Sequence, residues 1–118
     1  MMLSVEVLAE GEGAIFNGRY SDPNHPDGFR VISIDGEIDP ENGLREGTCK
    51  GSDTSSTEVD YTLPAKAGYM RIYDTIFVDF SPKGGPADFM GYFETEGGAG
   101  IRWSDGNKWP KVDDLFLQ

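Results

Sequence analysis

Glycine and proline interrupt this sequence so often that long helices have no room to form. The chain of 118 residues contains 16 glycines and 7 prolines, and the longest stretch free of both, residues 69–81, is rich in β-branched and aromatic side chains. Because Gly and Pro both disfavour the interior of a helix, their spacing excludes a helical bundle. The pattern instead favours short strands joined by tight turns.

The segments between these interruptions alternate polar and apolar residues, which is the period of a half-buried strand. Turn-forming sequences such as Asp35-Gly36 and Asp105-Gly106-Asn107 separate the segments. Strands are expected over residues 3–7, 15–20, 29–34, 58–63, 70–73, 75–80, 89–94, 100–104 and from 108 onward, with residues 112–118 forming either a last strand or a short terminal helix.

This spacing predicts one all-β domain covering residues 1–118. Strands that recur about every ten residues, with turn chemistry between them, are typical of antiparallel sandwiches and closed barrels. We predict a small antiparallel meander of about eight short strands that closes into a barrel, because closure removes the exposed sheet edges. A flattened β-sandwich is the alternative.

The charge balance excludes several classes of partner. The chain has 21 acidic and 10 basic residues, a net charge of −11. Phosphate backbones and anionic membrane surfaces repel such a protein, so we expect no nucleic-acid and no membrane partner, and a monomer or weak homodimer. No apolar run is long enough to span a bilayer, and the first residues lack a secretory signal. We therefore expect a cytoplasmic protein, or one of an organellar lumen after loss of a targeting segment, and not a secreted one.

The middle of the chain looks poor in core residues. Residues 35–60 contain eight acidic and two basic residues, and Leu44 is the single large aliphatic residue within 40–56. We predict long loops or short edge strands here, with residues 40–56 the most mobile or exposed internal segment. Cys49, the only cysteine, forms no internal disulfide and is expected to react readily with thiol reagents. The alternating acids lack the pattern of a calcium loop, so we expect no metal and no cofactor.

The sequence nearly repeats itself once. In both copies a strand ends on an aromatic residue and leads into a Ser-Asp turn, with Asn two places on: Arg19-Tyr20-Ser21-Asp22-Pro23-Asn24 and Arg102-Trp103-Ser104-Asp105-Gly106-Asn107. Side chains of Asp and Asn stabilise turns through hydrogen bonds to the backbone, which favours convergence. A pseudo-symmetric site is the alternative.

Several short sequence motifs of this chain resemble those of one group of proteins. The chain resembles a family of small uncharacterised proteins of photosynthetic eukaryotes, through Ser21-Asp22-Pro23-Asn24-His25-Pro26, Val78-Asp79-Phe80-Ser81-Pro82-Lys83-Gly84-Gly85-Pro86 and Trp103-Ser104-Asp105-Gly106-Asn107-Lys108-Trp109. The resemblance covers most of the chain outside residues 37–68. It implies a shared single-domain fold and no particular activity.

Two loops contain candidate polar groups. His25, the only histidine, lies between two prolines with Asp22 and Asp27 nearby. A carboxylate that orients its ring would make His25 a general base, whereas a turn-packing role is the simpler interpretation. Lys83-Gly84-Gly85 is the best anion-binding candidate, because glycine backbones let N–H groups converge beside a charge. A plain hairpin loop is the alternative for this segment.

Aromatic residues supply the last candidate group. The group comprises Tyr20, Tyr92, Trp103 and Trp109 with Asn24, Asp105 and Asn107. Aromatic faces beside planar polar groups suit sugars or flat ligands, and the alternative is that the indoles only fill the barrel. Tyr20 and Trp103 lie at strand ends, and a two-tryptophan hairpin can bring both indoles to one face. If the loops gather at one end of the barrel, they form a common mouth for a small polar or amphiphilic ligand. The predicted ligand-binding residues are Tyr20, His25, Arg30, Lys83, Trp103, Asp105 and Trp109.

Three functions follow as hypotheses. The first is a non-catalytic binding module for a small-molecule ligand. The second is an enzyme that uses His25 with Asp22 or Asp27. The third is a protein-interaction or structural domain without a pocket. An interior cavity lined by the tryptophans favours the first, a histidine–carboxylate pair in a cleft favours the second, and a filled interior with an exposed apolar patch favours the third.

Overall fold

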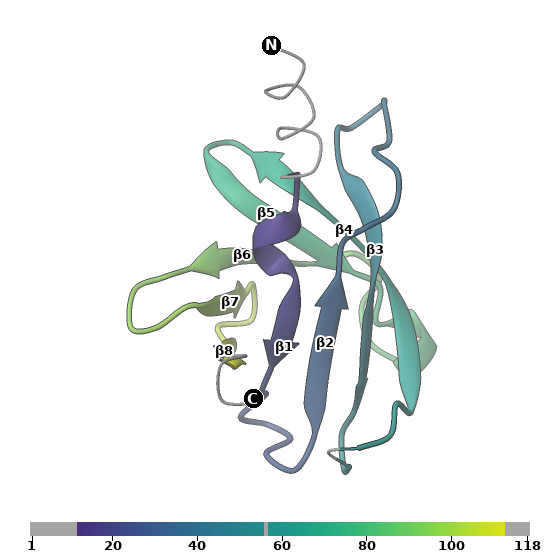
Figure 1. The fold of residues 1–118 in the computed structure, drawn as a ribbon, viewed down its shortest axis with the longest axis vertical. Helices are drawn as coiled ribbons and strands as arrows, with labels where there is room; N and C mark the ends of the chain where they lie inside the picture. Colours follow the sequence, from purple (N-terminus) through teal and green to yellow (C-terminus); the bar gives the residue numbers. More distant parts are fainter. Residues whose placement is uncertain (1–11, 56, 113–118) are drawn as a thin grey trace.

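Eight antiparallel strands follow one another around a closed barrel in this computed structural model, which describes residues 12–55 and 57–112 (Figure 1). Each strand pairs with its neighbours in sequence, and β1 pairs with β8 to close the sheet. The strands are β1 (Gly18–Tyr20), β2 (Phe29–Ser33), β3 (Arg45–Ser52), β4 (Tyr61–Met70), β5 (Tyr73–Val78), β6 (Phe89–Glu94), β7 (Gly100–Trp103) and β8 (Lys108–Val112). The structure confirms the predicted closed barrel, and the alternative of a flattened β-sandwich is wrong.

The connections alternate between two ends of the barrel because each strand reverses direction. Those after β1, β3, β5 and β7 share one end, called the loop end below: residues 21–28, 53–60, 79–88 and 104–107. Those after β2, β4 and β6 share the other, called the hairpin end: residues 34–44, 71–72 and 95–99.

The core fills the inside of the barrel. Ile32, Cys49 and Leu63 occupy one register row across β2, β3 and β4. The buried cluster is Phe16, Tyr20, Ile32, Ile34, Cys49, Leu63, Ala65, Ala67, Ile76, Val78, Ile101, Trp103 and Trp109. From β6, Phe89 and Phe93 pack against this cluster and are partly buried. The inward alternation predicted for Ile76 and Val78 is confirmed.

The prediction of long loops is confirmed for residues 35–44, 53–55 and 57–60 of the acidic middle segment, but it is wrong for the residues between 44 and 53. Its residues 45–52 form β3, which pairs with β2 on one side and β4 on the other and is no edge strand. Cys49 is fully buried, and Leu44 and Ser52 are buried as well. The segment looked coreless because its inward positions carry small residues. At Gly51 a Cβ atom would lie 2.3 Å from the Phe29 carbonyl oxygen and 2.9 Å from the Tyr61 hydroxyl.

The prediction of a strand over residues 15–20 is also partly wrong. Residues 14–16 form a 3₁₀ turn, η1 (Ala14–Phe16), and extended structure begins at Gly18. Gly13 opens the turn with φ of 75°, and the Phe16 N–H donates to its carbonyl oxygen. The turn places Phe16 in the core, where its carbonyl accepts a hydrogen bond from the Tyr20 hydroxyl at 2.8 Å.

The boundaries of β4 and β5 differ from the prediction too. The strand expected over 58–63 begins only at Tyr61 and continues to Met70, and Val59 before it is 52% exposed. The expected strand at 70–73 is instead a hairpin, whose turn residues Arg71 and Ile72 both have positive φ. The expected segments 3–7 and 113–118 lie outside the described residues.

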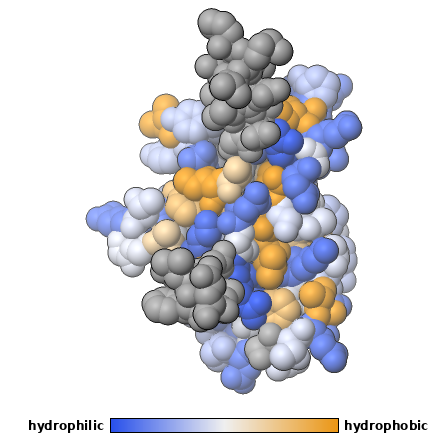
Figure 2. Space-filling model, viewed as in Figure 1, coloured by the Kyte–Doolittle hydropathy of each residue, from blue (hydrophilic) through white to orange (hydrophobic). Residues whose placement is uncertain are grey.

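The outer face of the barrel is mixed in character. Hydrophobic and hydrophilic residues are interspersed on the face that Figure 2 shows. A patch of large exposed apolar side chains occurs around the β4–β5 hairpin and comprises Tyr69, Met70, Ile72, Tyr73 and Tyr92. Within the described part of the chain, no helix is long and apolar enough to cross a membrane.

Candidate functional site

An open cleft of about 360 Å³ occupies the loop end of the barrel. Residues from the β1–β2, β5–β6 and β7–β8 connections line it, together with the ends of the strands that these loops join. The lining residues are Asp22, Asn24, His25, Arg30, Phe80, Lys83, Gly85, Pro86, Phe89, Trp103, Asp105, Asn107 and Trp109. The meeting of the 22–30 loop, the 81–86 loop and the 105–109 hairpin at one end is therefore found.

Arg30 is the buried charge at the centre of this end. It follows Phe29 at the start of β2, and its side chain is only 3% exposed. One terminal nitrogen, NH1, donates to the carbonyl oxygens of Phe29 and Ser52, both at 3.0 Å. The guanidinium carbon lies 5.2 Å from the centroid of the Trp109 ring, within cation–π range. Such a charge is tolerated inside a fold only when carboxylates balance it.

Asp22 provides the first of these carboxylates. Its Oδ2 lies 3.0 Å from Arg30 NH2, and its Oδ1 accepts hydrogen bonds from the Asn24 backbone N–H and the Asn107 side-chain amide, at 2.9 and 3.1 Å. Burial raises the pKa of the Asp22 carboxyl, but these hydrogen bonds, one with His25, and the Arg30 charge outweigh burial and hold the pKa below its usual value. Asp22 is therefore ionised and firmly held at neutral pH.

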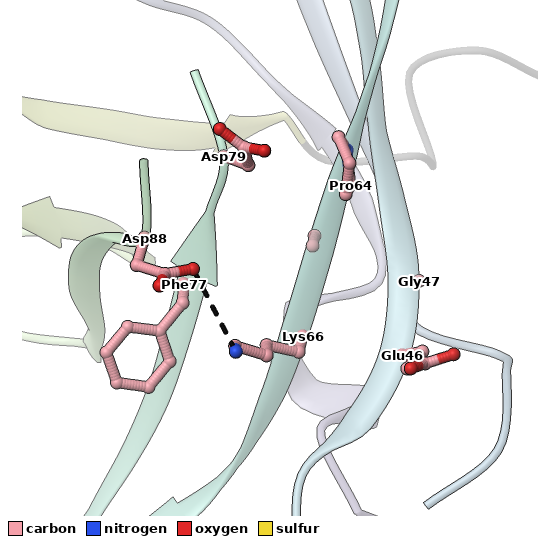
Figure 3. Close-up of a pocket in the computed structure, with 8 residues that line it drawn as sticks. Glu46, Gly47, Pro64, Lys66, Phe77, Asp79 and Asp88 are labelled. Carbon is pink, nitrogen blue, oxygen red and sulfur yellow. Dashed lines mark ion pairs between the residues drawn. The ribbon is translucent and has the colours of Figure 1, made fainter. Parts of the chain in front are cut away.

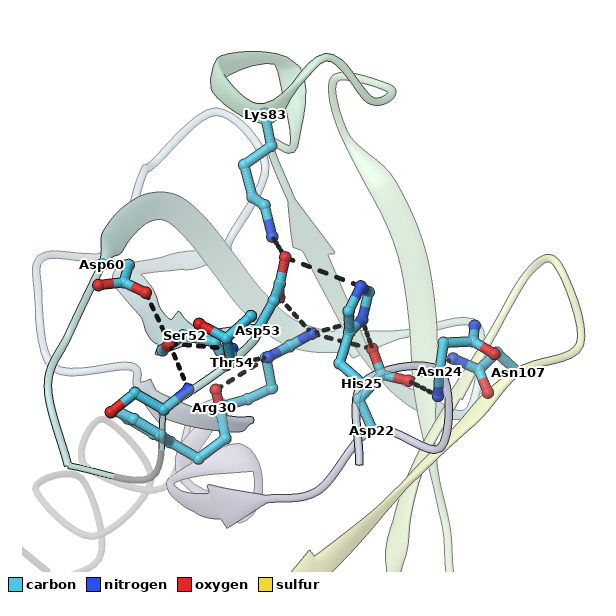
Figure 4. Close-up of polar contacts among 12 residues, drawn as sticks. Asp22, Asn24, His25, Arg30, Ser52, Asp53, Thr54, Asp60, Lys83 and Asn107 are labelled. Atoms are coloured by element: carbon cyan, nitrogen blue, oxygen red, sulfur yellow. Dashed lines mark hydrogen bonds and ion pairs between the residues drawn. The ribbon is translucent and has the colours of Figure 1, made fainter. Parts of the chain in front are cut away.

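Asp53, in the β3–β4 connection, provides the second carboxylate (Figure 4). Its Oδ1 lies 2.9 Å from Arg30 NH2, and its Oδ2 accepts a hydrogen bond from Lys83 Nζ at 2.8 Å. Burial raises the pKa of this carboxyl. The Lys83 hydrogen bond and the neighbouring positive charges lower the pKa by more than burial raises it, so the net pKa is below its usual value. Asp53 thereby links the β3–β4 and β5–β6 connections.

Lys83 reaches Asp53 because a compact turn positions it. The 3₁₀ turn η2 (Ser81–Lys83) begins after Asp79, whose Oδ1 accepts a hydrogen bond from the Ser81 N–H. The Phe80 carbonyl oxygen accepts hydrogen bonds from the N–H groups of Lys83 and Gly85. Lys83 Nζ also lies 3.9 Å from the centroid of the Tyr61 ring, which adds a cation–π contact.

His25 stands at the mouth of the cleft with its side chain 42% exposed. Its Nδ1 lies 3.3 Å from Asp22 Oδ2 and 3.2 Å from Arg30 NH2, and its Nε2 lies 3.7 Å from Asp53 Oδ2. Both ring nitrogens therefore face charged groups of the protein (Figure 4). The arrangement brings a histidine and two carboxylates together, and each ring nitrogen has a charged group of the protein as a neighbour.

Aromatic rings form the apolar wall of the cleft. The centroids of Trp103 and Trp109 are 4.8 Å apart, as the predicted two-tryptophan hairpin requires. Phe89 stacks on Trp103 with a centroid distance of 5.5 Å, and Phe80 packs edge-on against the same ring at 6.0 Å. Gly91 on β6 makes this packing possible, because a Cβ there would lie 2.8 Å from the Trp103 ring.

Six of the seven predicted ligand-binding residues line the cleft, and one does not. Tyr20 is fully buried in the core, and burial raises the pKa of its hydroxyl, which bonds to Phe16. Of the alternative catalytic carboxylates, Asp22 contacts His25, whereas Asp27 is exposed and is not among the cleft residues.

The near-repeat consists of two similar turns with different surroundings. Asp22 and Asp105 each accept a hydrogen bond from the backbone N–H two residues on, at 2.9 and 3.0 Å. Asp22 is buried beside Arg30, whereas Asp105 is exposed at the rim. This difference favours convergence on one kind of turn over a pseudo-symmetric site.

Sequence reasoning missed Asp53 and the two phenylalanines of the aromatic wall, Phe80 and Phe89. Asp53 could not be found because the segment before it has few large apolar side chains and does not look like a strand. Without that strand, the sequence does not show at which end of the barrel the β3–β4 connection lies. The meander rule supplies the missing signal, since connections after alternate strands share one end.

A second hollow lies on the outer face of β3, β4 and β5 (Figure 3). Its volume is about 340 Å³, and Lys66 and Asp88 approach each other across it at 3.9 Å. Phe77 is the single aromatic side chain in its lining. Among the residues that the structure describes, no group of three or more His, Cys, Asp or Glu side chains is arranged to hold a metal ion.

Comparison with known proteins adds no relative. No family model, curated protein or solved structure matches the chain.

Proposed function

We propose that the protein is a non-catalytic binding module that holds a small amphiphilic ligand in the loop-end cleft. The observation that carries the proposal is the composition of that cleft, in which the rings of Trp103 and Trp109 lie beside charged and amide side chains. Ligand sites are typically concave and mostly apolar, with a few polar groups that fix orientation. The ligand we infer has a flat apolar body and a polar end.

The scaffold supports this use. The barrel strands fix the positions of the cleft residues, while the connections at the rim are held by Asp22, Asp53 and Asn107. Such preorganisation lowers the entropy lost on binding. A cleft of about 360 Å³ lies within the usual size range for small-molecule sites.

The enzyme alternative is weaker on geometry. A general base needs a ring nitrogen within hydrogen-bond reach of the proton that it removes. Nδ1 of His25 faces Asp22 and Arg30, and Nε2 faces Asp53. We therefore assign His25 a role in organising the mouth of the cleft.

The interaction-domain alternative rests on a different surface. The exposed patch around Ile72, Tyr73 and Tyr92 lies by the β4–β5 hairpin, at the end of the barrel opposite the β5–β6 and β7–β8 loops. The filled barrel interior and this exposed patch are what the third hypothesis expects, but that hypothesis has no pocket, and the open cleft at the loop end argues against it as the main role. A monomer or weak homodimer in the cytoplasm or an organellar lumen, with a small-molecule ligand, completes the proposal.

Tryptophan fluorescence tests this function directly, because both tryptophans of the chain line the cleft. A panel of aromatic amides, alcohols and carboxylates is titrated against the native protein. We expect at least one class to change the emission with saturation. With a carboxylate of the panel, the change should weaken in Lys83→Gln and persist in Lys66→Gln, the matched lysine beside the outer hollow. Absence of a saturable change with every class would contradict binding in the cleft.

A further inference from the structure

We propose that the ligand of the loop-end cleft carries a carboxylate, and that this carboxylate replaces Asp53 on Arg30 and Lys83. The inference rests on the proposed binding function and adds the chemical class of the ligand. In the structure Asp53 acts as a tethered carboxylate that occupies the anion position itself (Figure 4).

Three donor groups converge on the Asp53 carboxylate. Arg30 NH2 lies 2.9 Å from Oδ1, while Lys83 Nζ and His25 Nε2 lie 2.8 and 3.7 Å from Oδ2. Each comes from a different part of the chain: β2, the β5–β6 connection and the β1–β2 connection. Three cationic or hydrogen-bonding side chains around one carboxylate form the environment that binds organic acids.

Asp53 fills this position incompletely. Arg30 NH1 is satisfied by two backbone carbonyls, and NH2 donates to Asp22. Within residues 12–55 and 57–112, however, no acceptor is bonded to Arg30 Nε, and Asp53 Oδ1 has no aligned hydrogen bond despite its proximity to NH2. The Nε and NH2 nitrogens form the edge of a guanidinium that a carboxylate engages with both oxygens. That edge is therefore open to a better-placed acid.

A second unsatisfied donor belongs to another residue of the cleft. The indole Nε1 of Trp103 is buried and lacks a hydrogen-bond partner among the described residues. Trp103 and Arg30 both pack on Trp109 and both line the cleft. A buried donor without a partner lowers the stability of the fold. Arg30 Nε and Trp103 Nε1 are two such donors. A ligand can supply acceptor oxygens to them once the side chains that cover them adjust.

The two aspartates differ in how tightly they are held. Asp22 makes contacts with four groups and its side chain is 7% exposed, whereas the Asp53 side chain is 29% exposed and lies just after the end of β3. Asp53 is therefore the partner that leaves. Exchange keeps the charges matched, because Arg30 and Lys83 then face Asp22 and the ligand carboxylate.

Asp53→Asn tests the exchange, because it removes the competing charge and keeps the shape of the side chain. The probes are 2-naphthoate and its uncharged counterpart 2-naphthamide, followed by tryptophan fluorescence. We expect Asp53→Asn to bind 2-naphthoate at least tenfold more tightly than the native protein does, with the affinity for 2-naphthamide changed less than threefold. Asp88→Asn is the matched control, since Asp88 pairs with Lys66 outside the cleft.

The outcomes separate this inference from the proposed function. Equal gains for both probes in Asp53→Asn, or an equal gain for 2-naphthoate in Asp88→Asn, overturn the exchange while leaving a binding cleft. Lys83→Gln offers a second test that leaves the β3–β4 connection intact. In that variant we expect a loss of affinity for 2-naphthoate of at least fivefold and little change for 2-naphthamide, and equal losses again overturn the inference.

Acetate provides a test that needs no aromatic body. In Asp53→Asn, titration with acetate should shift the ¹⁵N–¹H signal of Arg30 Nε with saturation, whereas acetamide should not. If acetate has no effect, the anion position is overturned whatever the naphthyl probes do. If acetate binds and neither naphthyl compound does, the anion position stands and the proposal of an aromatic amphiphile fails.

Discussion

The side-chain amide of Asn107 donates a hydrogen bond of 3.1 Å to Oδ1 of Asp22, across 85 positions of sequence. It joins the β7–β8 hairpin to the β1–β2 connection, at the point where the barrel closes between β8 and β1. The bond also fixes the carboxylate that balances Arg30. One contact thus ties barrel closure to the geometry of the cleft.

Removal of this contact should weaken the fold modestly. We expect Asn107→Ala to lower the free energy of unfolding by about 1 kcal/mol, the usual net value of a hydrogen bond. Urea denaturation followed by tryptophan fluorescence measures the change. An unchanged midpoint and slope would mean that the bond does not hold the two loops together in solution.

Stability should fall in acid because of Asp22. A carboxyl whose pKa is lower in the folded state stabilises the fold above its unfolded pKa, about 4, and this stabilisation is lost as the pH falls through the folded pKa. Hydrogen bonds and Arg30 outweigh burial at Asp22 and lower its pKa. The free energy of unfolding should therefore decline below about pH 4.

Asp22→Asn isolates that contribution. The variant should be less stable than the native protein by about 3 kcal/mol at pH 7, because it leaves Arg30 with Asp53 alone. The gap should narrow as the pH falls from 5 to 2, since protonation neutralises the native carboxyl as well. A gap that stays constant over this range would contradict the role assigned to Asp22.

The second half of the chain was readable from sequence because large side chains mark its inward positions. Ile76 and Val78 alternate with Thr75, Phe77 and Asp79, and strong turn signals separate this segment from the hairpin of Trp103 and Trp109. In such segments the period of two and the burial of bulky groups agree. The barrel and the approach of the two indoles followed from that agreement.

The strand in the middle of the chain was not predicted because the inward positions of β3 carry small residues. Gly47, Cys49 and Gly51 alternate on this strand, where backbone and large side chains from neighbouring strands fill the space. Counting apolar residues cannot detect a strand of this kind. Without β3, the number of reversals was uncertain, and Asp53 was not assigned to the same end as His25.

Cys49 should be unreactive in the native protein, contrary to the expectation from sequence. The thiol is fully buried, and burial raises its pKa to about 12. A thiol reagent at pH 8 should label Cys49 only as fast as the protein unfolds, and labelling should accelerate with urea. Rapid stoichiometric labelling of the folded protein would contradict the placement of β3.

Gly51→Ala tests the close packing of the same strand. The added methyl would meet the Phe29 carbonyl and the Tyr61 hydroxyl, so we expect a loss of about 2 kcal/mol in unfolding free energy, as for other overpacked sites. Lys50→Ala is the control, because Lys50 is the exposed neighbour on β3 and should change stability by less than about 0.5 kcal/mol. Equal effects of the two variants would contradict this packing.

The most direct test of the binding cleft is a ¹⁵N–¹H spectrum of the two tryptophan indoles during ligand titration. Both indole groups belong to cleft residues, and the chain has no other tryptophan. We predict that a ligand with a flat apolar body shifts both indole signals with one saturation curve, while amides of the β4–β5 hairpin remain unchanged. Shifts at the hairpin or beside Lys66 with both indole signals unmoved would contradict the account.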